Sequence, residues 1–82
     1  MAWFARFADP IALPGRRPLH TLAEARGYIL ELPKVERECI EWRTAWGILF
    51  QAATDGEPYV SMAHLAIERA LRKRSLRRSG SR

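Results

Sequence analysis

Residues 22–31 carry apolar side chains at the spacing of an amphipathic helix. These apolar positions are Leu22, Ala25, Ile29 and, just beyond the stretch, Leu32. Intervals of three and four residues place them on one helical face. The preceding TLAE predicts a capping box, in which the Thr21 hydroxyl accepts from the Glu24 N–H and the Glu24 carboxylate accepts from the Thr21 N–H. Because Pro33 disfavours helical geometry at the residue before it, the pattern predicts a first helix over residues 22–31.

A longer apolar stripe predicts a second helix over residues 35–54. Its members alternate at intervals of four and three residues: Val35, Cys39, Trp42, Trp46, Leu49 and Ala53. The first half of the stretch is charged on its outer side, whereas the second half reads AWGILFQAA and is apolar nearly all round. Such a helix needs cover on more than one side. We expect either the other elements of the chain or a second subunit to supply it.

The sequence DGEP separates this helix from a third. Gly56 suits a left-handed C-cap, and Pro58 suits the first turn of a new helix. The inner stripe of the third helix is Val60, Ala63, Ile67, Ala70 and Leu71. Polar residues stand at positions 74, 75 and 78, where the stripe would continue. We therefore predict a helix over residues 59–72 and a basic, flexible tail over residues 75–82.

The first twenty residues hold three of the five prolines. Pro14 and Gly15 form a turn sequence between short apolar stretches, which predicts a β-hairpin or an extended arm over residues 1–20. Pro10 and Pro18 restrict any strand here to an edge position. The predicted fold is mainly α: a three-helix bundle with a short N-terminal extended arm or β-hairpin, in one small domain over residues 1–74.

Composition narrows the class of protein. The chain has 82 residues, 48% of them hydrophobic, which is typical of a folded domain. Small apolar-rich chains often gain stability by oligomerising. The single cysteine, Cys39, fits a reducing compartment, so we expect a cytoplasmic protein. The N-terminal sequence lacks the apolar run of a signal peptide, and no stretch is long enough to span a membrane, so we expect no membrane partner.

Charge is distributed unevenly along the chain. Residues 1–68 carry seven basic and nine acidic side chains, a net charge of −2, whereas residues 69–82 carry seven basic and no acidic ones, a net charge of +7. A helix dipole accounts for two or three cations at its C-terminal end. The excess makes this end a candidate contact for a polyanion such as nucleic acid. The candidate residues are Arg69, Arg72, Lys73, Arg74, Arg77, Arg78 and Arg82.

A helix-turn-helix formed by the second and third helices would give a more specific form of nucleic-acid binding. The register counts against it, because Gln51, Asp55 and Glu57 stand where the motif wants apolar side chains. Asp55 and Glu57 would also repel phosphate at the start of the recognition helix. Nucleic-acid association by sequence-independent phosphate contacts is therefore the alternative hypothesis rather than the favoured one.

Residues with reactive side chains form no catalytic pattern. Cys39 lies on the core stripe of the second helix, where a cysteine acts as a small hydrophobe. His64 stands one turn before Glu68, a spacing that favours an ion pair, and Ser61 lacks the glycines of a nucleophile elbow. The two histidines and one cysteine have no metal-ligand spacing. We expect no enzyme activity, no cofactor and no metal.

Apolar residues outside the three stripes are candidates for self-association. They are Trp3, Phe4, Phe7, Ile40 and Ile48. Gly27 and Gly47 lie inside predicted helices, which indicates close helix approach at those points. The favoured hypothesis is a non-catalytic interaction domain that forms a homo-oligomer, such as a homodimer, or binds another protein.

Several of these motifs together resemble a family of short proteins of unknown function found in alphaproteobacteria. The shared pattern covers residues 7 to about 72: a Pro-Ile and Leu segment, T-L-x-x-A, Y-I-x-x-L-P, a helix with Trp near its middle, and A-I-x-R-A-L. The resemblance implies no activity, ligand or catalytic residue. The cationic end after Leu71 lies outside the shared pattern.

Overall fold

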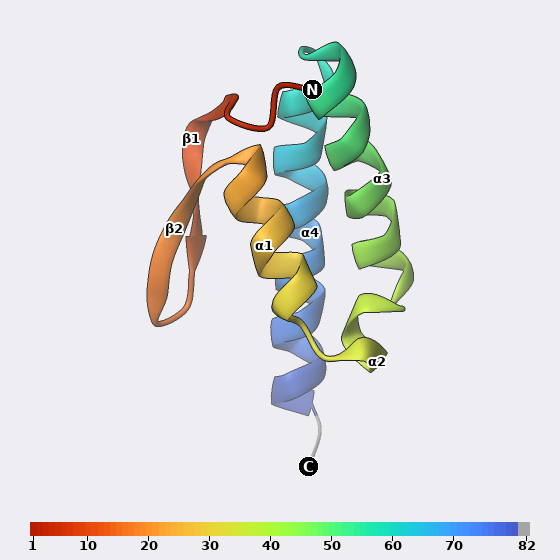
Figure 1. The fold of residues 1–82 in the computed structure, drawn as a ribbon. Helices are drawn as coiled ribbons and strands as arrows, with labels where there is room; N and C mark the ends of the chain where they lie inside the picture. Colours follow the sequence, from red (N-terminus) through yellow and green to blue (C-terminus); the bar gives the residue numbers. More distant parts are fainter. Residues whose placement is uncertain (81–82) are drawn as a thin grey trace.

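Two strands open the chain and four helices follow in the computed structural model, which describes residues 1–80 and the side chains of residues 1–76 (Figure 1). The strands are β1 (Arg6–Leu13) and β2 (Arg16–Thr21). The helices are α1 (Leu22–Glu31), α2 (Lys34–Arg37), α3 (Ile40–Asp55) and α4 (Tyr59–Gly80). The predicted mainly helical fold with an N-terminal hairpin is confirmed.

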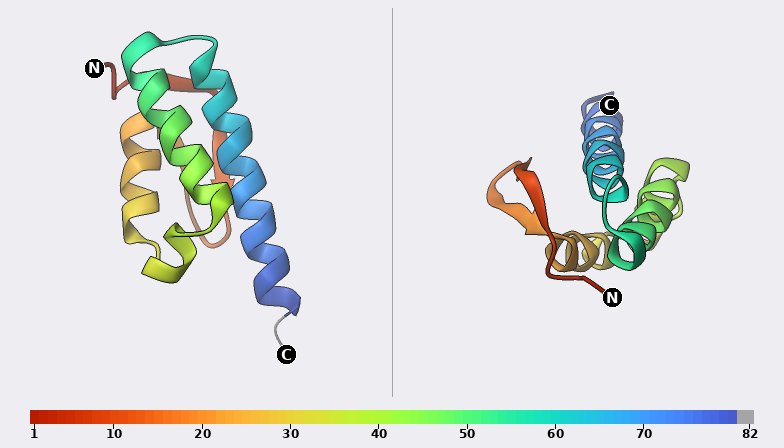
Figure 2. Two further views of the ribbon diagram at one scale, coloured as in Figure 1. Left: turned by 90° about the vertical axis from the view of Figure 1, so that its right-hand side faces the viewer. Right: turned by 90° about the horizontal axis from the view of Figure 1, so that it is seen from above.

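The hairpin, α1 and α3 form an arc along one side of α4 (Figure 2). Strand β2 lies against α1, β1 lies against α4, and α3 packs on both α1 and α4. The two longest helices, α3 and α4, lie side by side and run in opposite directions (Figure 1). The side of α4 that faces away from the arc carries the exposed residues of this helix.

The hairpin is tightly turned and buries one face. Gly15 has a φ of 66°, a conformation in which glycine carries no steric penalty, and it follows Pro14 in a two-residue link. Ile11 pairs with Leu19 across the antiparallel ladder. The buried residues of the hairpin are Phe7, Ile11, Leu13 and Leu19. Two strands alone are marginal in water, so this apolar face on α1 and α4 is what stabilises them.

Helix α1 has the predicted limits. The Thr21 hydroxyl accepts from the Glu24 N–H at 3.1 Å, as predicted, but the Glu24 carboxylate accepts from the His20 N–H at 2.6 Å rather than from that of Thr21. Thr21 is paired with Arg6 in the sheet, so the carboxylate reaches one residue further back. The helix ends before Leu32, which is extended as expected of a residue that precedes proline.

The predicted continuous helix over residues 35–54 is wrong. Helix α2 ends at Arg37, and the extended residue Cys39 caps the start of α3. The break leaves Val35 80% exposed instead of placing it in the core. It also turns Glu36 towards Trp42, whose Nε1 donates to the Glu36 carboxylate at 2.9 Å. Neither glycine nor proline marks the break, and the apolar spacing continues through it.

Helix α4 is longer than predicted. Gly56, with a φ of 73°, ends α3, and its N–H donates to the Ala52 carbonyl at 2.8 Å. Helix α4 then continues to Gly80, so the predicted end near Arg72 is wrong and residues 75–80 of the predicted tail are helical. Arg74 stands where the apolar stripe would continue, and contacts with α1 and α2 hold it there. Residues 81–82 of the tail lie outside the described residues.

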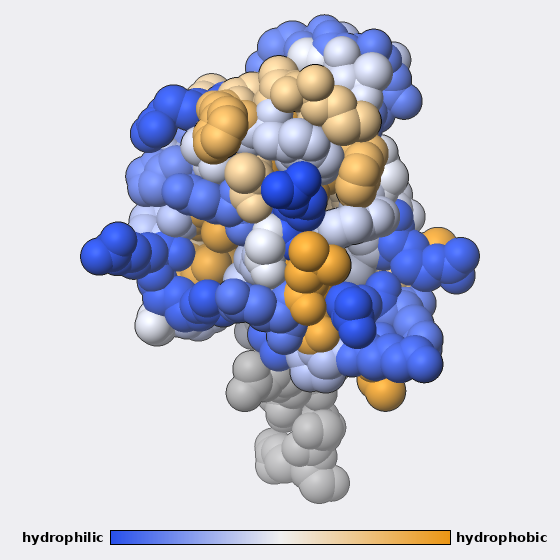
Figure 3. Space-filling model, in the orientation of Figure 1, coloured by the Kyte–Doolittle hydropathy of each residue, from blue (hydrophilic) through white to orange (hydrophobic). Residues whose placement is uncertain are grey.

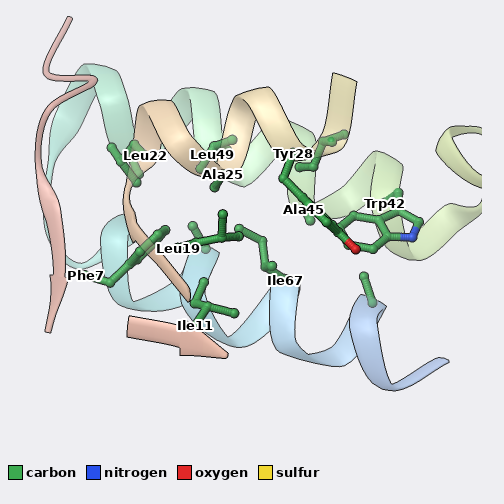
Figure 4. Close-up of a cluster of buried hydrophobic side chains, with 14 of the residues drawn as sticks. Phe7, Ile11, Leu19, Leu22, Ala25, Tyr28, Trp42, Ala45, Leu49 and Ile67 are labelled. Atoms are coloured by element: carbon green, nitrogen blue, oxygen red, sulfur yellow. The ribbon is translucent and has the colours of Figure 1, made fainter. Parts of the chain in front are cut away.

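The core joins every long element (Figure 4). Trp42, at 0% exposure, is the largest fully buried side chain, and its ring centroid lies 6.0 Å from that of Tyr28. The predicted inner stripe of α1 is confirmed, as is that of α4 as far as Ala70. The other labelled core residues in Figure 4 are Phe7, Ile11, Leu19, Leu22, Ala25, Ala45, Leu49 and Ile67.

Residues 1–5 tie the end of α3 to the start of α1. The Ala2 N–H donates to the Ala53 carbonyl at 2.7 Å, and the Trp3 carbonyl accepts from the Ala23 N–H at 2.8 Å. The Trp3 ring lies between two helices, 4.9 Å from the Phe50 ring on α3 and 4.3 Å from the Arg26 guanidinium on α1. The chain itself therefore covers part of the all-round apolar half of α3.

Candidate interaction surface

An apolar groove runs between α3 and α4. The groove is lined by Ile40, Glu41, Thr44, Ile48, Met62, Leu65, Ala66 and Arg69. Ile40 is 67% exposed, Leu65 is 65% exposed and Met62 is 44% exposed. Large apolar side chains on both walls are thus exposed to solvent.

Helix α4 presents this surface because it has two stripes rather than one. Its buried stripe faces α3 and the hairpin. A second series, at intervals of three and four residues, faces outward: Met62, Leu65, Arg69, Arg72 and Leu76. This outer stripe is apolar at Met62 and Leu65, basic at Arg69 and Arg72, and apolar again at Leu76, which is 62% exposed. A helix that is apolar on both faces over its first half normally has a second partner.

The ends of this outer face carry opposite charges. Glu57, exposed just before α4, accepts from the Ser61 N–H at 3.1 Å and from the Ser61 hydroxyl at 3.0 Å. An acidic group is thereby fixed at the helix N-terminus, where the helix dipole favours it. Arg69, Arg72 and Lys73 are exposed about three to four turns further along. The face is acidic at one end, apolar next to it and basic at the other end.

Two of the five predicted self-association residues line the groove, and three do not. Ile40 and the partly exposed Ile48 lie on the α3 wall. Phe4 is 86% exposed but belongs to the N-terminal segment. Phe7 is a correction: it is 6% exposed and packs edge-on against the His64 ring at 5.6 Å, because the hairpin buries it. Trp3 is also held within the chain, by the contacts described above.

Sequence reasoning missed Met62 and Leu65, the central residues of the α4 wall. The inner apolar stripe of this helix was the only one predicted. The spacing of Met62, Leu65 and Arg69 repeats the same three-and-four rhythm and would have revealed the outer stripe. The predicted close helix approach at Gly27 and Gly47 is wrong within the chain, since a Cβ atom added at either would meet nothing within 4 Å.

The candidate polyanion residues separate into three groups. Arg69, Arg72 and Lys73 have exposed side chains on α4. Arg74 is turned inward, with a side chain that is 24% exposed. Arg77 and Arg78 belong to α4 but their side chains lie outside the described part of the structure, and Arg82 lies outside the described residues.

Arg74 belongs to a polar cluster that joins three helices. Its Nη1 donates to the Tyr28 hydroxyl at 3.4 Å, and its buried Nε lies 3.9 Å from a carboxylate oxygen of Glu36. The other carboxylate oxygen of Glu36 accepts from the Trp42 indole. The Arg74 guanidinium therefore faces α1 and α2 and helps to hold α4 in place. In this position it does not face solvent, where a polyanion would bind.

The residues with reactive side chains are not brought together. The Cys39 thiol donates to the Val35 carbonyl at 3.6 Å, His64 pairs with Glu68 at 3.0 Å, and Ser61 binds Glu57. The predicted His64–Glu68 pair is confirmed. Within the described residues, no three His, Cys, Asp or Glu side chains form a group that could hold a metal ion.

The opposite side of α3 carries a second, more divided apolar surface. A groove between α1 and α3 is lined by Ile29, Leu30, Arg37, Trp42, Arg43 and Trp46. Leu30 is 54% exposed there. Figure 3 shows this side, where apolar patches are separated by charged side chains. The α3–α4 groove, with large exposed apolar residues on both walls, is the stronger candidate for an interface.

Comparison of the chain with family models, with curated proteins and with solved structures gave no match. Among the helices of the part that the structure describes, none combines the length and the apolar character that crossing a membrane requires.

Proposed function

We propose that the chain is a small, non-catalytic interaction domain that self-associates through the α3–α4 groove. The observation that carries the proposal is the exposure of Ile40, Met62 and Leu65 on adjoining walls of one groove. Burying a large apolar side chain completely contributes about 1.5–3 kcal/mol. In a two-fold dimer these three residues are buried in both copies at one interface, whereas a small ligand would cover them in one copy only.

The three long helices act in this proposal as a three-helix bundle on which the hairpin is laid. Helix α2 is a single turn that closes one end. The cytoplasm is the proposed compartment, because the one cysteine of the chain, Cys39, carries a free thiol on a partly exposed side chain.

Sedimentation velocity at micromolar concentrations tests the proposal with one variant in each groove. Leu65→Glu places a charge in the α3–α4 groove, and we expect it to raise the dissociation constant at least about tenfold. Leu30→Glu places the same charge in the α1–α3 groove and should leave the dimer intact. Circular dichroism should show the same helix content in both. A wild-type protein that stays monomeric at all accessible concentrations contradicts the proposal.

A second candidate function is nucleic-acid association through the basic end of the chain. The observation that favours it is the exposure of Arg69, Arg72 and Lys73 in the second half of α4. Lysine and arginine contacts to phosphate give affinity that falls steeply with salt and depends little on sequence.

Titration of labelled DNA and RNA across a range of salt concentrations tests this candidate. The informative variant is Arg69→Gln/Arg72→Gln/Lys73→Gln, because it removes these three exposed cations and leaves the internal contacts of Arg74 in place. For every phosphate that the variant no longer neutralises, the slope of log affinity against log salt should fall by about 0.9 for duplex DNA. An unchanged slope and affinity in the variant would show that these three residues do not hold the nucleic acid.

A further inference from the structure

We propose that two copies of the chain pair antiparallel along α4, with the two-fold axis of the dimer at Leu65. This inference rests on the proposed self-association and adds its partner, orientation and register. Each α4 lies along the α3–α4 groove of the other copy. Leu65 of one copy meets Leu65 of the second.

The apolar register supports this centre. In an antiparallel pair centred on Leu65, the numbers of two residues at the same level add up to 130, so Met62 lies at the level of Glu68 of the second copy. The carboxylate of Glu68 is paired with His64 of its own copy. The Met62 side chain then lies between the second copy's Ile40 and Arg69, which line the same stretch of groove. The long aliphatic stem of an arginine can cover apolar surface while its charged end stays in water. The alternating intervals of three and four residues along the outer stripe of α4 suit such a seam.

The charges decide the orientation. Glu57, fixed by its bonds to Ser61, marks the level of the first turn of α4. In the antiparallel pair, position 58 faces Arg72 of the second copy and Ser61 faces Arg69. The acidic start of α4 in each copy therefore lies beside the basic half of α4 in the other copy, and the two-fold axis produces this contact twice. A parallel pair would set Arg69, Arg72 and Lys73 against the same cations of the second copy, where like charges repel.

The distribution of charge along α4 also indicates that the molecule bound in the groove is a second copy of the chain. A two-fold interface requires a surface that is its own complement when reversed. The outer face of α4 has this property, because the exposed Glu57 just before the helix and the exposed Arg69, Arg72 and Lys73 stand on either side of Leu65. Glu68, the acidic residue on the basic side, is paired with His64. Apolar Met62 and Leu65 fill the centre.

Charge exchange tests the predicted contact between Glu57 and Arg72. Glu57→Lys and Arg72→Glu should each weaken the dimer about threefold to tenfold, because two exposed ion pairs become two like-charge contacts. The double variant should return to within about twofold of wild type. It also lacks the Glu57 cap on α4, so recovery cannot come from restored helix capping. A double variant at least as weak as the weaker single variant overturns the register.

Cross-linking tests the orientation. In a Cys39→Ala background, Ser61→Cys and Arg69→Cys chains should be joined by a short thiol cross-linker when mixed, and neither should cross-link to itself. Positions 61 and 69 are about 12 Å apart along one helix, so a parallel pair would give the opposite result. Self-cross-linked chains in a protein that sediments as a dimer overturn the antiparallel geometry alone. Absence of any dimer overturns the proposed function as well.

Discussion

At the residue scale, Arg74 shows how one polar side chain can extend a helix beyond its apolar stripe. After Ala70 and Leu71 the inner face of α4 would lose its packing, but Arg74 reaches the Tyr28 hydroxyl and lies beside the Glu36 carboxylate. A buried polar group that loses its partners costs more than a typical hydrogen bond contributes. The polar cluster is therefore sensitive to removal of any one member.

Replacing Arg74 should destabilise the fold. Arg74→Ala leaves the Glu36 carboxylate, which is 16% exposed, without this cation, and we expect a loss of about 1–3 kcal/mol in the free energy of unfolding. Arg43→Ala removes an exposed arginine from α3 and should change stability by less than about 0.5 kcal/mol. Urea unfolding followed by circular dichroism measures both. Equal stabilities for the two variants would rule out a structural role for the cluster.

Trp3 and Phe4 are adjacent aromatic residues with different roles. The Trp3 ring packs between Arg26 and Phe50, whereas Phe4 is 86% exposed. Trp3→Ala should lower the unfolding free energy by about 2–3 kcal/mol, since it removes partly buried aromatic surface and a cation–π contact. Phe4→Ala should stay within about 0.5 kcal/mol of wild type. Thermal unfolding at one protein concentration compares them, and a larger effect from Phe4→Ala would contradict the assignment.

At the scale of elements, Gly27 and Gly56 respond to the same substitution in opposite directions. Gly27 lies inside α1 with open space around it, so Gly27→Ala should stabilise the protein by about 0.5–1 kcal/mol. Gly56 has a φ of 73° and a ψ of −144° at the end of α3, a conformation that residues with a Cβ rarely adopt, so Gly56→Ala should destabilise the protein by about 1–3 kcal/mol. Chemical denaturation of both variants gives the sign directly. A destabilising Gly27→Ala would mean that close packing, supplied by a second copy, surrounds α1 in solution.

Local signals predicted the elements that local chemistry controls. The cap at Thr21, the stop at Pro33 and the turn at Pro14-Gly15 each depend on residues close in sequence, and all three are confirmed. The break before α3 has no such local signal: it brings Glu36 into contact with Trp42 and Arg74, residues six and 38 positions away. Apolar spacing contains no information about such polar contacts, so the pattern predicted one continuous helix.

The candidate surface was predictable in part for a related reason. Ile40 and Ile48 fall off the core stripe of their helix, which is enough to predict that they lie outside the core, and both line the α3–α4 groove. Met62 and Leu65 required a second stripe to be recognised on a helix already assigned a core face. Phe7 was misassigned because a residue of a strand is buried only if it lies on the face of the hairpin that packs against the helices. Apolar and polar residues alternate weakly in this hairpin, so the sequence does not determine which face that is.

At the scale of the whole molecule, the proposed self-association and the proposed polyanion binding would compete for the same cations. The proposed dimer sets Arg72 beside Glu57 of the second copy and places Arg69 along the seam. A phosphate backbone would need both side chains free. Because linkage between two binding equilibria is reciprocal, a polyanion that binds the monomer should dissociate the dimer, and mutations that prevent pairing should strengthen polyanion binding.

The double variant Met62→Gln/Leu65→Gln tests this competition, since it weakens the apolar seam without changing the charge. We expect it to bind a short DNA duplex about fivefold more tightly than wild type at concentrations where wild type is dimeric, near the lower end of typical coupling between sites. Fluorescence anisotropy measures the affinity, and sedimentation with added duplex should show wild-type dimer converting to bound monomer. If duplex binds dimer and variant equally well, the cations that hold it lie outside the α4 seam, and the two proposed activities belong to separate surfaces.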